Sequence, residues 1–368
     1  MGKWCINEDS MQNNFWQDIV KRAYDMDRPL FILAPMADVT DCVFRELIAK
    51  YSKFGTKESL LDVFWTEFVS ADGLCSPVRE VLKRDLVYSD KEHPIVAQLF
   101  GSNVENMRNA SKLCAELGFD GIDINMGCPD KSIEKQGAGA AMMKNPENAR
   151  AIIRAAYDGA RDAKKEIPIS VKTRIGYNKI EYKTWLEEIL KEPITTLIIH
   201  FRTRKEMSLV PAHWELAREI IDYVHSLRPD LIIIGNGDVL DITDGIKKYK
   251  ETGIDGVMIG RGIFGKPWLF NAIGFEPTLK QKFEILIEHT HNFEKTLGDS
   301  LIRIINSDGR ITEKVVPGKS FAIMKKHYKA YINGFTGAKE FREKMMQCNN
   351  ATEVEKILRE FIKENFVL

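Results

Sequence analysis

Reactive and polar side chains recur in this sequence at one kind of place, directly after a short apolar segment. They are Cys128 in "DINMGC", Lys172 and Arg174 in "SVKTR", His200 and Arg202 in "IIHFR", and the glycine-rich "IGNGD" and "IGRG". If the apolar segments are parallel strands of one barrel, their carboxyl ends meet at one rim. A thiol, several cations and two glycine turns would then face one ligand.

Cys128 is the most reactive candidate among the six cysteines. It follows Asn125 by three residues and precedes Pro129, so the strand ends and the thiol lies in a loop. An ordinary thiol has a pKa near about 8.5 and is mostly protonated at neutral pH. The residues alone allow Cys128 to act either as an acid or as a nucleophile.

Lys172 and Arg174 are two residues apart and therefore share one face of a strand. Burying two unpaired cations is costly, so they imply an anionic or carbonyl-rich ligand. A Lys172 that merely extends its ammonium group to solvent is the alternative. His200 alone is typical of a satisfied core histidine, but its place between the strands that end in Lys172 and Asn236 favours a ligand contact.

The two glycine-rich turns contain Asn236, Gly237 and Asp238, and then Gly260 and Arg261. Glycines let backbone N–H groups approach phosphate oxygens, and an arginine adds a fork of donors. Either turn alone is equally typical of an ordinary tight turn. Together, after the last two strands of a barrel, they predict a phosphate site.

The elements that position these residues follow from periodicity. Eight short runs rich in β-branched residues alternate with helical patterns, at 30–37, 62–69, 94–101, 119–126, 168–174, 195–202, 230–238 and 255–262. Continuously apolar runs such as "LIIIG" indicate strands buried on both faces. A doubly wound open sheet competes, but the first run lacks its G-x-G-x-x-G turn. We predict an α/β protein with a (β/α)8 TIM barrel.

The domain organisation is predicted from where the strand signal begins and ends. Residues 1–28 read as an N-terminal helical extension, and 29–272 as the barrel domain. Charged helical patterns separated by Gly and Pro then run through 273–368, which predicts a C-terminal all-helical domain.

Composition restricts the possible partners. The 53 Lys and Arg residues balance 53 Asp and Glu residues, so any nucleic-acid surface must be local. The cysteines form no C-x-x-C pair and no histidine cluster has metal-ligand spacing, which predicts reduced thiols and no metal. Without an apolar run of about 18 residues or a signal-peptide core, we expect a soluble, cytoplasmic, monomeric protein that does not contact a membrane.

One stretch is locally basic. Between Arg310 and Lys344 the chain has nine Lys and Arg residues against three Glu, and aromatic residues interleave with them. This pattern predicts an RNA-binding surface, with a solvated helical face as the alternative. The candidate contacts are Lys319, Lys325, Lys326 and Lys329, with Tyr328, Tyr331 and Phe335 available to pack or to stack on bases.

The ring of motifs resembles that of the tRNA-dihydrouridine synthases, flavoenzymes that reduce uridines in tRNA, and most of all their bacterial B-type members. The similarity covers about residues 30–350. Its motifs are "APMADVTD", "TEFVSADGL", "QLFG", "INMGCPDKSIEKQGAGAAMM", "VKTRIG", "IIHFRTR", "IGNGD", "DGVMIGRGIFGKPWLF" and the tail "PGKSFAIMKKHYKAYINGFTGAKEFREKM". The cysteine motif is highly specific, whereas "APM" and "NGD" recur in other flavin barrels.

The resemblance implies FMN at the barrel mouth, NADPH or NADH as reductant and tRNA as partner. It implies flavin contacts for Pro35, Met36, Gln98, Lys172, His200, Asn236, Gly237, Asp238, Gly260 and Arg261. It implies that Asn125, Arg174 and Arg202 hold the uracil. Hydride from reduced flavin N5 would add at uracil C6, and Cys128 would protonate C5.

The sequence departs from the family in one segment. After "HFRTR" the family commonly has Gln and small residues before Trp, whereas this chain reads "KEMSLVPAHW". Alternatives to the family activity are a flavin barrel that acts on a free pyrimidine or other small molecule, a synthase that acts on ribosomal RNA, and a non-redox RNA-binding protein.

Overall fold

The protein is described here from a computed structural model, which covers residues 15–298, 300–305, 311–316 and 318–366, with side chains outside 299–317. Residues 1–14 of the expected N-terminal extension and Arg310 lie outside this range, as does the side chain of Lys314. Contacts divide the described chain into two compact units. The first comprises 15–35, 61–86 and 92–261, and the second 36–60, 87–91 and 262–366.

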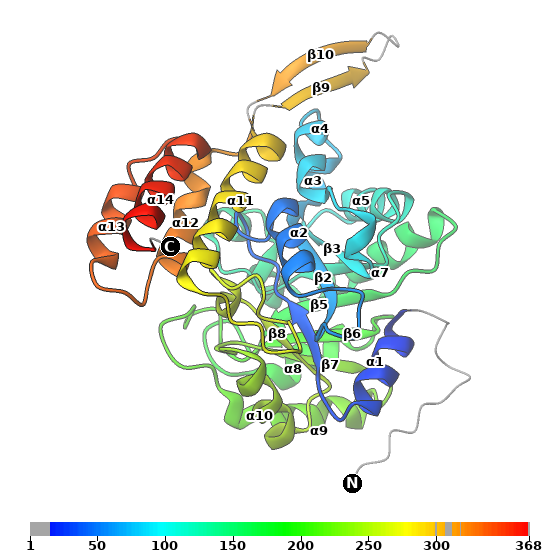
Figure 1. The fold of residues 1–368 in the computed structure, drawn as a ribbon. Helices are drawn as coiled ribbons and strands as arrows, with labels where there is room; N and C mark the ends of the chain where they lie inside the picture. The colour runs from blue at the N-terminus through cyan, green and yellow to red at the C-terminus, as the bar shows by residue number, and fades with distance from the viewer. Residues whose placement is uncertain (1–14, 299, 306–310, 317, 367–368) are drawn as a thin grey trace. The chain divides into compact units, whose positions relative to one another are not determined.

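Eight parallel strands in the first unit close into a barrel in the order β1 to β8 (Figure 1). β1 also pairs with β8, with Leu30 opposite Gly256, which completes the ring. The predicted TIM barrel is thus confirmed. Each of the eight predicted runs contains a strand: β1 Leu30–Leu33, β2 Leu61–Ser70, β3 Ile95–Phe100, β4 Gly121–Asn125, β5 Ile169–Arg174, β6 Thr196–His200, β7 Ile232–Asn236 and β8 Gly256–Ile259.

The strands are apolar because both of their faces are covered. Every residue of β1, β3, β4, β7 and β8 is buried, as the near-continuous hydrophobic runs predict. The first run produces a strand of only four residues. Pro35 lacks the N–H group that would continue the ladder, so the chain turns away there.

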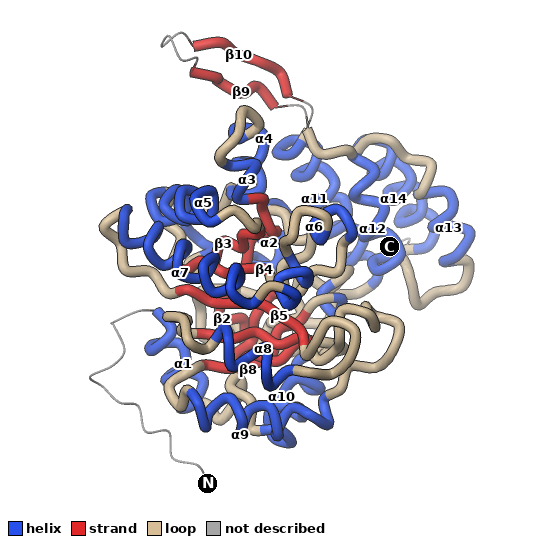
Figure 2. Tube along the Cα trace, turned by 180° about the vertical axis from the view of Figure 1, so that it is seen from behind, coloured by secondary structure: helices blue, strands red, loops and turns tan. Residues whose placement is uncertain are grey.

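Helices cover the outside of the barrel within the first unit, where Figure 2 shows the strands in red among blue helices. These helices are α1 Phe15–Asp25, α3 Ala71–Leu74, α4 Arg79–Leu82, α5 Val104–Glu116, α6 Lys131–Glu134, α7 Pro146–Asp162, α8 Tyr182–Ile189, α9 Ala217–Leu227 and α10 Ile242–Thr252. α7 begins at an N-terminal cap, with Asn145 Oδ1 accepting from the Asn148 N–H and Pro146 in the first turn.

The second unit is mainly helical, with α2 Cys42–Tyr51, α11 Leu279–Leu297, α12 Lys325–Tyr331, α13 Ala338–Met345 and α14 Ala351–Asn365. The rings of Phe283, Phe335, Phe341 and Phe361 pack together in it, with centroids 4.6–6.2 Å apart. The predicted helical C-terminal region is confirmed.

That region also contains two strands that the sequence analysis did not predict. β9 Ser300–Ile305 and β10 Ile311–Val316 pair antiparallel, with Ile305 opposite Ile311. The signal is present in the sequence, because β-branched runs flank "NSDG", a composition typical of hairpins. Within the described residues, no helix is long and apolar enough to cross a membrane.

Candidate active site

The end of β4 positions the thiol of Cys128. Asn125, the last residue of the strand, accepts through Oδ1 from the backbone N–H groups of Gly127 at 3.1 Å and Cys128 at 2.9 Å. The Cys128 carbonyl accepts from the Ala140 N–H at 2.9 Å. Gly139 makes this return possible, because its φ is +60° and a Cβ there would lie 2.8 Å from the Cys128 oxygen. The turn is therefore built by its own side chains and backbone.

The Cys128 side chain is half-buried against an apolar cluster. It packs with Phe68 on a group formed by Phe100, Ile133 and Ala138. This burial raises the pKa of the Cys128 thiol above its ordinary value, although Arg174 and Lys172 act in the opposite direction. Cys128 is therefore a neutral thiol at neutral pH, which suits a proton donor better than a nucleophile.

A buried polar network lies beneath this turn. Asn125 donates through Nδ2 to Gln98 Oε1 at 3.1 Å, and Gln98 donates through Nε2 to Asp123 Oδ2 at 2.6 Å. Ser170 Oγ donates to the other Asp123 oxygen at 2.7 Å. Burial raises the pKa of Asp123 to about 6. The network fixes the orientation of the Gln98 and Asn125 amides.

Sequence reasoning missed Asp123. Its signal was a carboxylate within the apolar strand "GIDIN", a position that an acidic residue occupies only when it has partners.

The two cations of β5 are held by different partners. Lys172 Nζ donates to Asn236 Oδ1 at 3.1 Å, and Asn236 Nδ2 donates to the Met258 carbonyl at 2.9 Å. Burial, followed by the charge of Arg174, lowers the pKa of Lys172 to about 8. Arg174 donates to the carbonyls of Gly127, Thr203 and Met207 at 2.7–3.1 Å. Of the two cations, Lys172 therefore loses its positive charge at the lower pH.

The ends of β6, β7 and β8 bring a histidine together with two arginines and a carboxylate. His200 Nε2 lies 3.0 Å from Arg202 Nη1, and burial together with the cations around it keeps the pKa of His200 well below its ordinary value. Its neutral ring therefore accepts from Arg202. Asp238 pairs with Arg202 through one oxygen and with Arg261 through the other, the latter at 2.7 Å.

The turn after β7 requires glycine. Gly237 has φ +117°, and a Cβ there would lie 2.8 Å from Ala212 Cβ and 3.0 Å from His200 Cδ2. Gly260 directly follows β8, and Arg261 with its side chain 65% exposed comes next. A flexible, exposed guanidinium beside a glycine turn is free to rearrange around an anion.

Most of the predicted site residues therefore gather at one rim of the first unit. The residues placed there by hydrogen bonds are Gln98, Asn125, Cys128, Lys172, Arg174, His200, Arg202, Asn236, Gly237, Asp238 and Arg261. Pro35 and Gly260 are placed there because they follow the ends of β1 and β8. Met36 belongs to the second unit, where its N–H donates to Thr40 Oγ1 at 2.9 Å. Among the described residues, no group of three or more His, Cys, Asp or Glu could hold a metal.

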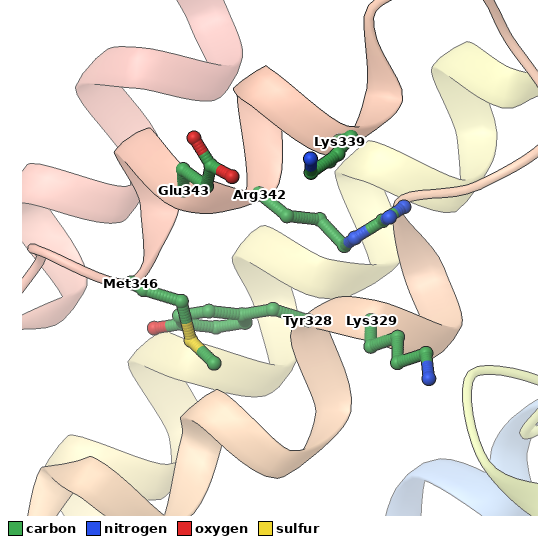
Figure 3. Close-up of a pocket in the computed structure, with 6 residues that line it drawn as sticks. All are labelled: Tyr328, Lys329, Lys339, Arg342, Glu343 and Met346. Atoms are coloured by element: carbon green, nitrogen blue, oxygen red, sulfur yellow. The ribbon is translucent and has the colours of Figure 1, made fainter.

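The predicted RNA-binding lysines belong to the second unit. Lys326 Nζ pairs with Asp38 at 3.2 Å, and Lys325 and Lys329 lie on α12. Lys329 lines a shallow pocket of about 240 Å³ with Tyr328, Lys339, Arg342, Glu343 and Met346 (Figure 3). Three cations, Lys329, Lys339 and Arg342, and one carboxylate, Glu343, therefore line this pocket. Lys319 lies outside the pocket, and its N–H donates to the Leu297 carbonyl.

The interleaved aromatic residues pack inside the unit. Tyr328 and Tyr331 are fully buried, and Phe335 joins the cluster of phenylalanine rings. Tyr328 and Tyr331 are therefore part of the core and present no surface on which bases could stack, whereas Phe335 is only partly buried.

The rim and the barrel define the class of protein. A closed (β/α)8 barrel places a thiol, buried cations and two glycine turns at the carboxyl ends of its strands, which is where barrel enzymes have their active sites. A profile of the dihydrouridine synthase (Dus) family matches residues 32–366. The chain belongs to the dihydrouridine synthase family, as the motifs predict.

Curated relatives match this chain over nearly its whole length. The chain is 37% identical over 354 residues to a probable tRNA-dihydrouridine synthase of Staphylococcus aureus, covering 95% of this chain and 96% of the relative. It is 37% identical over 353 residues to probable tRNA-dihydrouridine synthase 2 of Bacillus subtilis, covering 95% and 97%. A solved histamine dehydrogenase from Rhizobium sp. 4-9 aligns with a TM-score of 0.45 at 11% identity, over 71% of this chain and 48% of that one.

Proposed function

We propose that this protein is a tRNA-dihydrouridine synthase that reduces the C5–C6 double bond of uridine with FMN as cofactor and NADPH or NADH as reductant. Family membership and the names of the curated relatives support the activity. The observation that carries the assignment is the Cys128 turn, in which Asn125 holds the backbone of a residue with a neutral thiol at the barrel rim, near the buried Arg174 and the half-buried Lys172.

The rim residues fit FMN. The turn after β7 holds Gly237 at φ +117°, and Arg202 and Arg261 are two cations that share the single carboxylate of Asp238. This local excess of positive charge suits a phosphate. We assign the phosphate to Asn236, Gly237, Asp238, Gly260 and Arg261, and the flavin ring to Pro35, Met36, Gln98, Lys172 and His200.

The flavin, when bound, supplies the hydride that adds to uracil C6. Negative charge then moves toward uracil C5 and O4, since the double bond is conjugated with the C4 carbonyl. Cys128 donates its proton to C5, and the neutral state of the thiol keeps that proton available. Asn125, Arg174 and Arg202 hold the uracil, while the charge of Lys172 stabilises the electron-rich ring system next to it.

The target base has to leave its stack to reach a barrel rim, so a loop nucleotide of a folded RNA suits the site better than a base within a helix. The lysines of the second unit provide local positive charge in a chain without net charge. We propose that Lys319, Lys325, Lys326 and Lys329 contact the tRNA backbone, and that the region 273–368 is the RNA-binding domain.

Replacing Cys128 by alanine tests the assignment. We expect Cys128→Ala to retain FMN, measured by absorbance, and to reduce tRNA about 100- to 10,000-fold more slowly, the usual contribution of a positioned acid. Dihydrouridine is quantified by mass spectrometry of nucleosides, with free uracil as a parallel substrate. Cys75→Ala, at an exposed cysteine of the same unit, is the matched control. Wild-type turnover in Cys128→Ala would exclude the acid role.

A further inference from the structure

Two loops flank the end of β5 at the rim. We call residues 126–138 the Cys128 loop, because they follow β4 and contain Cys128, and residues 201–213 the β6 loop, because they follow β6. The β6 loop includes the segment in which this chain departs from the family pattern, and its Leu209 is 85% exposed. The contacts that hold this unusual segment in place are therefore relevant to the position of the Cys128 thiol in the other loop.

The inner contact between the loops is made by Arg174. Its Nε donates to the Gly127 carbonyl of the Cys128 loop at 2.7 Å. Its Nη1 donates to the β6 loop, at the carbonyls of Thr203 and Met207, at 3.1 and 3.0 Å. Arg174 is 6% exposed, so these bonds are shielded from water.

A second contact lies farther out and joins the same two loops. Arg204 of the β6 loop donates through Nε to Glu134 Oε1 at 2.7 Å and through Nη2 to the other carboxylate oxygen. The Glu134 side chain is 11% exposed and the Arg204 side chain 23%. A bidentate pair of this burial is geometrically specific, in contrast to most surface ion pairs.

The loop after β5 also contacts Arg204. The Tyr177 ring lies under both Arg204, with Cζ 5.2 Å from the ring centroid, and Lys144, with Nζ at 4.0 Å. The N–H groups of Arg204 and Lys205 each donate at 2.9 Å to the carbonyls of Gly176 and Tyr177. Arg204 is thus fixed by backbone and side chain, and the loops after three successive strands are joined at one point.

Cys128 lies in the chain between the two contacts, one residue after Gly127 and six before Glu134. Arg204 and Glu134 are therefore placed to restrain the thiol without touching the reacting atoms. We propose that the Arg204–Glu134 pair is a positioning device that holds the Cys128 loop closed against the β6 loop and so fixes the proton donor over the substrate. The catalytic part of this proposal rests on the acid role proposed for Cys128.

The experiment measures how readily the Cys128 thiol is alkylated. Full-length FMN-loaded protein is treated with iodoacetamide, and alkylation of Cys128 is followed by peptide mass spectrometry, with the peptide of the exposed Cys75 as internal standard. Arg204→Gln and Glu134→Gln should each raise the Cys128 rate about fivefold, the factor that roughly 1 kcal/mol makes in an equilibrium. They should also lower kcat on tRNA while KM and FMN content stay unchanged.

Two further variants separate positioning from folding. Either charge reversal alone should raise the alkylation rate and lower kcat, and the double variant Glu134→Arg/Arg204→Glu should return both toward their wild-type values. Arg108→Gln breaks another bidentate pair of the same unit, with Asp162, between α5 and α7, and should change neither quantity.

Unchanged Cys128 alkylation in both single variants would overturn the proposal, even if their melting temperatures fall, because the pair would then serve stability alone. If instead Cys128→Ala turns out to be active, the acid role fails while the alkylation result still reports on the restraint.

Discussion

Replacing His327 with leucine tests how the core of the second unit responds to acid. His289 of α11 and His327 of α12 are fully buried, with ring centroids 4.7 Å apart, and the Phe44 ring lies 5.0 and 4.7 Å from them. None of their ring nitrogens has a hydrogen-bond partner among the described residues. Burial lowers the pKa of His327 to about 3 and also keeps the pKa of His289 well below its ordinary value.

The sign and size of the effect follow from these shifts. Both pKa values are lower in the folded protein than in the unfolded chain, where an ordinary histidine titrates near about 6.5. The folded state is thus at full stability above about pH 6.5 and loses stability as the pH falls toward 3. At pH 5 the unfolded chain has taken up almost one proton per histidine. For His327, whose pKa is about 3 in the folded state, this costs the folded state about 2 kcal/mol relative to pH 7, and His289 adds a cost of the same sign.

Hydrogen exchange of peptides from α11 and α12, corrected for the intrinsic pH dependence of exchange, measures this cost locally. Between pH 7 and pH 5, wild-type opening free energies should fall by about 2 kcal/mol more than those of His327→Leu. His213→Gln serves as the control, because Glu215 and Glu206 raise the pKa of His213 in the other unit. An identical pH dependence in wild type and His327→Leu would refute the reasoning.

Two further predictions concern charge at the site and on the RNA-binding region. Because the pKa of Lys172 is about 8, its positive charge is lost as pH rises through that value, so kcat should decline above about pH 8 in the wild type, and Lys172→Gln should be slow and lack this decline. A pH–rate profile with a competent electron donor checks it. In the second unit, Lys325→Gln/Lys329→Gln should weaken tRNA binding and reduce the slope of log affinity against log salt by about 1 to 2 units, whereas Lys247→Gln, an exposed lysine of the barrel unit, should do neither.

The sequence was sufficient to predict the elements of the barrel and the rim residues that end them. Periodicity located all eight strands because each is largely buried and rich in apolar and β-branched residues. Position then placed Lys172, His200 and Asn236 together, since the ends of parallel strands meet at one rim. These inferences depend only on local pattern and on the topology of the fold.

Contacts between distant loops could not be predicted in this way. Glu134 and Arg204 are 70 residues apart, and neither stands at a strand end. Tyr328 and Tyr331 show the same limit, because their spacing among lysines left open whether they pack or stack on bases, and tertiary packing buries both completely. Such outcomes depend on how loops and helices pack, which one sequence does not specify.

The charges at the rim explain why the thiol, the cations and the glycine turns belong to one site. Lys172 and Arg174 are held in the barrel mouth with lowered pKa values, which shows that the fold pays a desolvation cost to keep them there. Their hydrogen-bond partners are an amide and backbone carbonyls, and none of these carries a negative charge. A ligand that is anionic, or that becomes so during reaction, offsets this cost. In the reaction we propose, the same positive potential favours the electron-rich state that precedes protonation at C5, and the neutral thiol of Cys128 is the assigned proton donor.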